Sequence, residues 1–236
     1  TDRSLLETAA RLAIEYASTV DDRSAAPAAE AIGALDALAG PLPDRGGDAD
    51  EVIERLARVG GAANMATPGP HYFGFVNGAT FPVALAASFL VDAWDQNAAL
   101  PVMSPVSARL HDVTREWLAD LLGFAEHTDV AFVTGATVAN ATCLAAARDA
   151  LLIERGWDVQ GDGLFGAPAL QVVIGAKAHS TLRKSLGLVG LGRDRVIVVP
   201  ADDQGRIIAS ALPDLDPADG PILCCAQAGE VNTGAF

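Results

Sequence analysis

Basic residues are scarce in this chain. Its 236 residues include 16 Lys and Arg against 30 Asp and Glu, which gives a formal net charge of −14 at pH 7. A surface of that sign repels the phosphates of nucleic acids and the headgroups of anionic membranes, so we expect neither as a partner. An anionic ligand would need a local binding site, because the field of the chain as a whole opposes its approach.

Cysteines and long apolar runs are also few. Cys143, Cys224 and Cys225 are odd in number and lie in apolar runs, which predicts reduced core thiols in a cytoplasmic protein. No pair of His and Cys residues has the spacing of metal ligands, so no metal site is expected. The apolar run over residues 81–91 is too short to span a bilayer and is followed by an acid, so no membrane span is expected.

The carboxyl-terminal part of the sequence alternates between two periods. Apolar runs typical of strands alternate with segments of helical spacing, a pattern that predicts an α/β fold with a parallel sheet covered on both faces. We expect strands over residues 130–134, 171–175, 195–199 and 221–226, helices over 137–153 and 180–188, and a short helical piece over 209–215. Ligands of such sheets bind at the carboxyl ends of the strands.

The first of these strand ends is a sharp turn at Gly135. An apolar run stops there, and an Ala-rich helix follows at once. The free N–H groups at the start of a helix and the helix dipole form an anion site, to which Thr137 adds a hydroxyl and Asn140 an amide. This arrangement predicts a bound phosphate. Many strand–glycine–helix turns hold no ligand, so the turn by itself leaves an empty site equally open.

His179 lies at the second strand end, between an expected strand and an expected helix. A single histidine in such a place is more often an ordinary polar residue, but the shared rim favours a function in stacking on a flat ligand or exchanging protons. We expect His111 and His127 on the surface and keep His71 as a candidate. Lys177, beside the rim, is expected to reach solvent.

The amino-terminal part has the pattern of a helical arm. Helices are expected over residues 4–18, 28–38 and 81–94, with a further one capped by Asp48 and another starting at Ser104 and ending at Gly123. They carry no cluster of catalytic residue types, so packing or subunit contact is the expected purpose. Residues 67–80 are rich in Gly, Pro and aromatics, and they either plug the core or line a pocket or an interface.

Five ordered segments resemble motifs of one enzyme family. They are PHYFGFVNG, SPVSARLHDVTREWLADLLGF, FVTGATVANATCLAAAR, AHSTLRKS and QAGEVNTGAF. Over residues 70–236 the chain resembles the amino-terminal half of the pyridoxal-phosphate-dependent group II decarboxylases, which include aromatic amino acid and glutamate decarboxylases. The resemblance implies a fold-type-I, pyridoxal-phosphate-dependent transferase-like fold, with a mostly parallel sheet flanked by helices and preceded by a helical arm.

The resemblance also implies an organisation and a set of site residues. Residues 1–103 would form the amino-terminal arm and substrate loop, and residues 104–236 a cofactor-binding large domain that continues beyond 236. Ala136 and Thr137 would bind the cofactor phosphate, and His179 would act as a catalytic residue that stacks on the pyridine ring. The residues implied to bind substrate are His71, Phe73, Phe75, Glu230 and Asn232.

The implied activity is decarboxylation of an L-amino acid to its amine and carbon dioxide, with pyridoxal 5′-phosphate as cofactor. The enzyme would be a cytoplasmic homodimer whose active site lies at the subunit interface. Three departures leave the substrate and the reaction open. Val138 stands where the family usually has an acid, His111 replaces a common Glu, and Gly-Glu-Val at 229–231 replaces the usual Gly-Thr-Thr.

The family's cofactor-binding lysine and the Asp that pairs with the pyridine nitrogen are both expected beyond residue 236. The two lysines of the chain, Lys177 and Lys184, do not occupy the expected place. Three alternatives therefore stay open at this point. The chain could belong to another fold-type-I lyase or aldehyde-forming enzyme, it could be a non-catalytic fragment or pseudoenzyme, or it could be a generic nucleotide-binding α/β domain.

Overall fold

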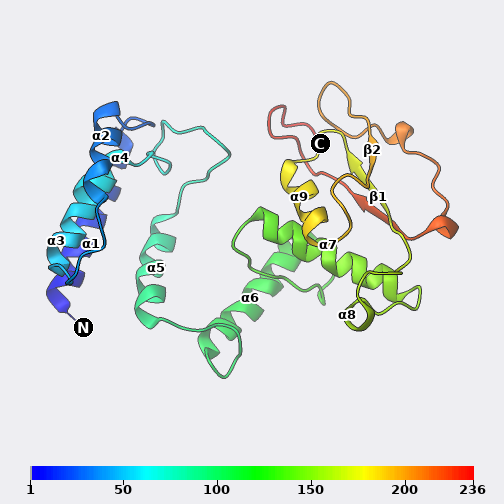
Figure 1. Cartoon of the computed structure of the whole chain (residues 1–236), viewed down its shortest axis with the longest axis horizontal. Helices are drawn as coiled ribbons and strands as arrows, with labels where there is room; N and C mark the ends of the chain where they lie inside the picture. Colours follow the sequence, from blue (N-terminus) through cyan, green and yellow to red (C-terminus); the bar gives the residue numbers. More distant parts are fainter. Residues whose placement is uncertain (1) are drawn as a thin grey trace. The chain divides into compact units, whose positions relative to one another are not determined.

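A computed structural model describes residues 2–236, which divide into two compact units (Figure 1). The first unit ends at Ser104, and the second covers Pro105–Phe236. The helices of the first unit are α1 (Arg3–Thr19), α2 (Ala29–Gly33), α3 (Ala49–Arg55), α4 (Gly61–Ala63) and α5 (Pro82–Trp94). Short turns of 3₁₀ helix lie at Val20–Asp22 and Ala34–Leu38, and a π-helical turn at Leu56–Gly60 joins α3 to α4.

Acidic side chains cap the starts of α1 and α3 in the first unit. The carboxylate of Asp2 accepts hydrogen bonds from the backbone N–H groups of Ser4 and Leu5 at the start of α1. Asp48 accepts from the N–H groups of Asp50 and Glu51 and caps α3 as predicted. A carboxylate at this position satisfies N–H groups that have no partner within the helix and interacts favourably with the helix dipole.

The segment that precedes α5 is irregular, as predicted, and it does not plug a core. The side chains of Phe73 and Phe75 are each 92% exposed. Phe75 and Val76 have φ angles of 55° and 58°, a left-handed conformation that is costly for bulky residues. The helix α5 has the apolar composition of a buried helix, but none of its residues is buried within its unit.

The second unit contains a parallel three-stranded sheet with the order β2–β1–β3. Its strands are β1 (Gln171–Gly175), β2 (Ile197–Val199) and β3 (Ile222–Cys225), close to three of the predicted ranges. Its helices are α6 (Pro105–Leu122), α7 (Ala136–Ile153), α8 (Val159–Asp162) and α9 (Ser180–Leu188), with 3₁₀ turns at Ala209–Ala211 and Pro217–Asp219.

The core of the second unit lies where α7 and α9 meet one face of the sheet (Figure 1). Alternate residues of β1 and β3 point to this face, and the register pairs Val172 with Leu223. The buried cluster consists of Leu144, Val172, Ile174, Leu186 and Leu223. By length and composition α7 could also cross a membrane, which the sequence analysis missed. Within the protein, apolar residues of α7 pack against α9 and the sheet.

The strand predicted over residues 130–134 is not formed. Within the described residues 2–236 this segment pairs with none of the three strands, and Phe132 is largely exposed. An apolar, β-branched run is compatible with a strand, but a strand exists only when a neighbour supplies its hydrogen bonds. The local sequence was therefore sufficient to predict an extended conformation and insufficient to predict pairing.

Replacing Leu186 by Ala should test the packing of α9 on the sheet. Leu186 is 0% exposed, and truncation of a fully buried leucine costs about 2–5 kcal/mol of unfolding free energy. Leu188, on the same helix and 68% exposed, provides the matched control, for which a change within about 0.5 kcal/mol is expected. Urea unfolding of the two alanine variants measures both values, and equal losses would contradict this description of the core.

Candidate functional site

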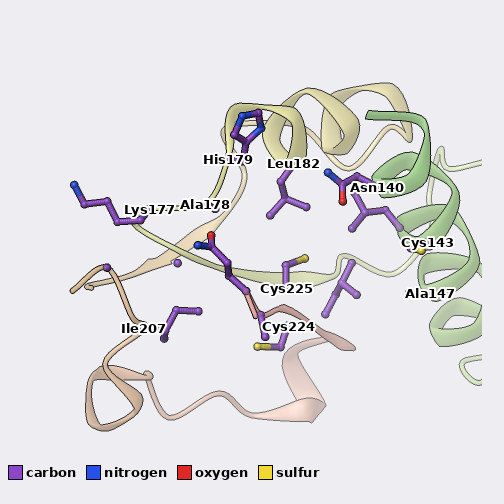
Figure 2. Close-up of a pocket in the computed structure, with 16 residues that line it drawn as sticks. Asn140, Cys143, Ala147, Lys177, Ala178, His179, Leu182, Ile207, Cys224 and Cys225 are labelled. Carbon is purple, nitrogen blue, oxygen red and sulfur yellow. The ribbon is translucent and has the colours of Figure 1, made fainter. Parts of the chain in front are cut away.

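A cavity of about 440 Å³ opens at the carboxyl ends of β1 and β3. Its walls come from α7, from the segment between β1 and α9, and from the residues that follow β3 (Figure 2). Asn140 and Cys143 line it from α7, His179 from the start of α9, and Gln227 from the end of β3. The cavity therefore lies at the edge of the sheet where the sequence predicted a ligand.

The turn into α7 has the free donors of an anion site. Gly135 precedes the helix, and with φ 165° it is extended. No side chain caps this end of α7, so the first N–H groups of the helix have no acceptor within it. A side chain at Gly135 would meet no other atom within 4 Å, which means that the approach to these N–H groups is open. Thr137 lies one helical turn before the cavity residue Asn140.

A buried hydroxyl holds this turn in place. Ser185 is 0% exposed, and its Oγ donates a hydrogen bond of 2.9 Å to the carbonyl oxygen of Thr137. A buried hydroxyl without a partner would be costly, so this bond fixes α9 against the first turn of α7. The sequence analysis missed Ser185, because nothing local distinguishes it from other serines on a helix.

His179 is held by a chain of hydrogen bonds that starts on α7. Its Nδ1 accepts from the backbone N–H of Thr181 at 3.2 Å, which makes His179 the cap of α9. The hydroxyl oxygen of Thr181 lies 2.9 Å from the same Nδ1 and accepts from Asn140 Nδ2 at 3.2 Å. Figure 2 shows His179 and Asn140 at the upper rim of the cavity.

The donors in this chain determine the tautomer of His179. A ring nitrogen that accepts an N–H carries no proton, so the neutral ring has its proton on Nε2. The Thr181 hydroxyl, having accepted from Asn140, has its own proton free to donate to Nδ1. These hydrogen bonds therefore hold the His179 ring in one orientation, with its N–H at Nε2. The sequence analysis named His179 and Asn140 but missed Thr181.

The thiols are free, and the prediction that they belong to the core is wrong for Cys143 and Cys224, which are exposed. Cys225 is partly buried and packs against the core cluster, and all three thiols line the cavity. Burial, followed by the neighbouring Cys224, raises the pKa of the Cys225 thiol, which favours its protonated form at neutral pH. Among residues 2–236, no group of three or more His, Cys, Asp or Glu could hold a metal ion.

The sequence also singled out a lysine and two further histidines, whose positions the structure gives. Lys177 is exposed and points away from the other labelled residues in Figure 2, as expected. His127 is also exposed. His111 is partly exposed and is not a free surface residue, because its Nε2 bonds the carbonyl of Val130 at 2.9 Å and its ring meets Phe132 edge-on at 5.7 Å. It thereby anchors the segment that leads into the Gly135 turn.

The residues predicted to bind substrate lie in two segments, one in each unit. Glu230 and Asn232 lie in a turn after β3, and Glu230 lines a second cavity of about 430 Å³ that shares Gln227 with the first. His71, Phe73 and Phe75 belong to the first unit. Their assignment to a substrate pocket stays a prediction.

Thr181→Val should remove one of the two hydrogen bonds at His179 Nδ1. The variant keeps the shape of the side chain and the backbone N–H but removes the hydroxyl between Asn140 and His179. We expect the ¹⁵N shift of His179 Nδ1 to change because that bond is lost, while Nδ1 of the neutral ring stays unprotonated because the backbone N–H still bonds it. Thr142→Val is the control, because that hydroxyl bonds only Val138 of its own helix. Identical His179 spectra in Thr181→Val and the unaltered protein would refute the hydrogen bonds from Asn140 through Thr181 to His179.

Comparisons with known proteins match most of the chain. A family model described as "Pyridoxal-dependent decarboxylase conserved domain" matches residues 40–236. An aromatic-L-amino-acid decarboxylase of Bacillus atrophaeus is 26% identical over 201 residues, which are 82% of this chain and 39% of the relative. A cysteine sulfinic acid decarboxylase of Mus musculus is 27% identical over 200 residues, 83% of this chain and 39% of the relative.

A solved structure shares the fold. The crystal structure of the glutamate decarboxylase domain of diaminobutyrate-pyruvate transaminase and L-2,4-diaminobutyrate decarboxylase from Vibrio parahaemolyticus has a TM-score of 0.79 at 23% identity. The match covers 88% of this chain and 45% of that one. The chain spans about two fifths of the length of the two curated relatives.

Proposed function

Because the chain belongs to the pyridoxal-dependent decarboxylase family, we propose that the rim of its sheet holds pyridoxal 5′-phosphate and that the protein decarboxylates an L-amino acid to its amine and carbon dioxide. One observation carries this proposal. The uncapped start of α7 and the oriented ring of His179 at the start of α9 are tied together by Ser185 and by the Asn140–Thr181 pair.

The residues present fit the two ends of the cofactor. The N–H groups of Ala136 and Thr137, with the Thr137 hydroxyl, would hold the phosphate, because a helix start offers donors and a positive dipole end to an anion. This local attraction is needed in a chain with a net charge of −14. The flat ring of His179 would cover one face of the pyridine, and its orientation is fixed from Nδ1.

The protein's share of the chemistry is positioning. When bound, the cofactor supplies the electron sink that stabilises the negative charge left as carbon dioxide departs. Thr137 and the turn would fix its phosphate end, and the Asn140–Thr181 pair would keep His179 from rotating away from the ring. Holding the reacting groups in one geometry lowers the entropic part of the barrier.

The substrate side of the proposal rests on two segments. We assign to the substrate site the turn after β3, which contains Glu230 and Asn232, and the irregular loop, which contains His71, Phe73 and Phe75. The 92% exposure of Phe73 and Phe75 leaves both rings available to contact a substrate or a partner subunit. The exposed apolar side chains of α5 support a homodimer with the site at its interface. We also propose that the enzyme is cytoplasmic.

The proposed activity is tested by supplying the purified protein with pyridoxal 5′-phosphate and a panel of L-amino acids. Release of carbon dioxide in equal amount to the matching amine is expected for at least one of them. Carbon dioxide with an aldehyde in place of the amine would contradict simple decarboxylation. Absence of both cofactor binding and carbon dioxide release would contradict the proposal as a whole.

His179→Ala should weaken cofactor retention and turnover. Loss of one aromatic contact costs about 0.5–1.5 kcal/mol, or roughly threefold to tenfold in the dissociation constant of the cofactor. Equilibrium dialysis against pyridoxal 5′-phosphate gives that constant, and the carbon dioxide assay gives kcat. His127→Ala, at an exposed position, should leave both unchanged. An unaltered dissociation constant in His179→Ala would remove the stacking function.

A further inference from the structure

The turn after β3 is organised around one carboxylate. Glu230 Oε2 accepts the backbone N–H groups of Asn232 at 2.7 Å and Thr233 at 2.9 Å, and Oε1 accepts Asn232 Nδ2 at 2.8 Å. The backbone closes the same turn, because Glu230 N donates to Ala235 O at 2.9 Å and Gly234 N donates to Glu230 O at 2.8 Å. Residues 230–235 thus form a turn whose N–H groups depend on this side chain.

A second turn, over residues 202–206, has the same construction. Asp202 accepts the backbone N–H groups of Gln204 and Arg206, each at 2.9 Å, and its other oxygen accepts Arg206 Nε at 2.8 Å. Ile207, which follows this turn, packs on the last residue of β1. A Cβ on Gly175 would lie 2.8 Å from Ile207 Cγ1, so no side chain larger than hydrogen fits between them. The second turn is therefore fixed to the end of β1.

The two turns are locked to each other. The Thr233 hydroxyl donates to the carbonyl oxygen of Gln204 at 2.7 Å. Gly205, at φ +84°, lies directly on the Glu230 side chain, since a Cβ there would be 2.6 Å from Glu230 Cγ. These contacts therefore connect the end of β1 to the 202–206 turn, and that turn to Glu230 and the 230–235 turn.

We propose that Glu230 is a positioning residue, which clamps the 230–235 turn onto the 202–206 turn and so fixes Gln227 beside the cofactor site. Gln227 is one of five residues that line both cavities, and it is the one whose side chain bonds the start of this turn, because its Nε2 donates to Gly229 O at 3.0 Å, directly before Glu230. The functional half of this inference rests on the proposed function, whereas the clamp itself is a property of the chain alone.

The charged carboxylate of Glu230 accepts hydrogen bonds from donors of its own turn. The Asn232 side chain, followed by the backbone N–H of Thr233, lowers the pKa of Glu230 below its ordinary value. The carboxylate is consequently ionised at neutral pH, and three donors already bond it. It therefore acts through the turn and does not serve as the counter-charge of a cationic substrate.

Comparison of Glu230→Ala with Glu230→Gln separates these two functions. Alanine removes all three bonds. Glutamine keeps a carbonyl oxygen for the two backbone N–H groups, and its NH₂ can bond the side-chain oxygen of Asn232 once that amide turns over. A positioning residue should thus be rescued by Gln, whereas a counter-charge should be lost equally in both variants.

The first readout is hydrogen exchange of the purified protein without cofactor, followed by mass spectrometry of peptides covering residues 202–206 and 228–236. Glu230→Ala should raise exchange in the second peptide by about threefold to tenfold, and Glu230→Gln should stay near the unaltered protein. Thr233→Val, which removes the bond to Gln204, should raise exchange in both peptides. Asp203→Ala, an exposed acid on the adjoining turn, is the matched control and should change neither.

The second readout is kinetic, with the cofactor-loaded protein. Glu230→Ala should lower kcat by about threefold to tenfold while Glu230→Gln retains it, because the loss lies in geometry and not in charge. Unchanged exchange in Glu230→Ala would overturn the clamp, and unchanged kcat would overturn its connection to the site. Equal losses in both variants with normal exchange would assign Glu230 to direct substrate contact. If the unaltered protein has no activity, the proposed function fails while the exchange result stands.

Discussion

The contact between α7 and α9 is the constraint on which the rest of the second unit depends. Ser185 bonds the first turn of α7, and Asn140 reaches across to Thr181 on α9. Beneath these polar bonds, Leu144 and Leu186 join the strands in one buried cluster. The apolar contacts supply the free energy of association, and the hydrogen bonds determine the register. As a result, the start of α7 at Ala136 and the ring of His179, which are 43 residues apart in the sequence, are held close together.

The sequence predicted the elements that local pattern determines. β1 has the predicted bounds, α9 begins at Ser180 as expected, and α7 begins one residue before the predicted Thr137. These segments combine a clear period with a clear stop, which leaves little room for a competing conformation. The position of His179 was likewise predictable, because it follows β1 and parallel strands end at one edge, whereas the anion site at the Gly135 turn stays a prediction.

The remainder depends on partners that a sequence window does not contain. Residues 130–134 have strand composition but no strand neighbour among the described residues, and α5 is apolar but unburied in its own unit. Ser185 and Thr137 are 48 residues apart, so the value of that hydroxyl emerges only once the helices meet. The bonds from the Glu230 carboxylate to the turn that follows it could not be predicted from the sequence either, because they depend on how that turn closes.

The three cysteines around the cavity give the chain an intrinsic footprinting label. Thiol reagents attack the thiolate, so alkylation is fastest where access is free and slowest where burial favours the protonated form. Cys143 is exposed, whereas Cys225 is partly buried with a raised pKa. A ligand that fills the cavity would shield them to different extents. Occupancy of the site could therefore be followed by the ratio of two alkylation rates, without an introduced dye.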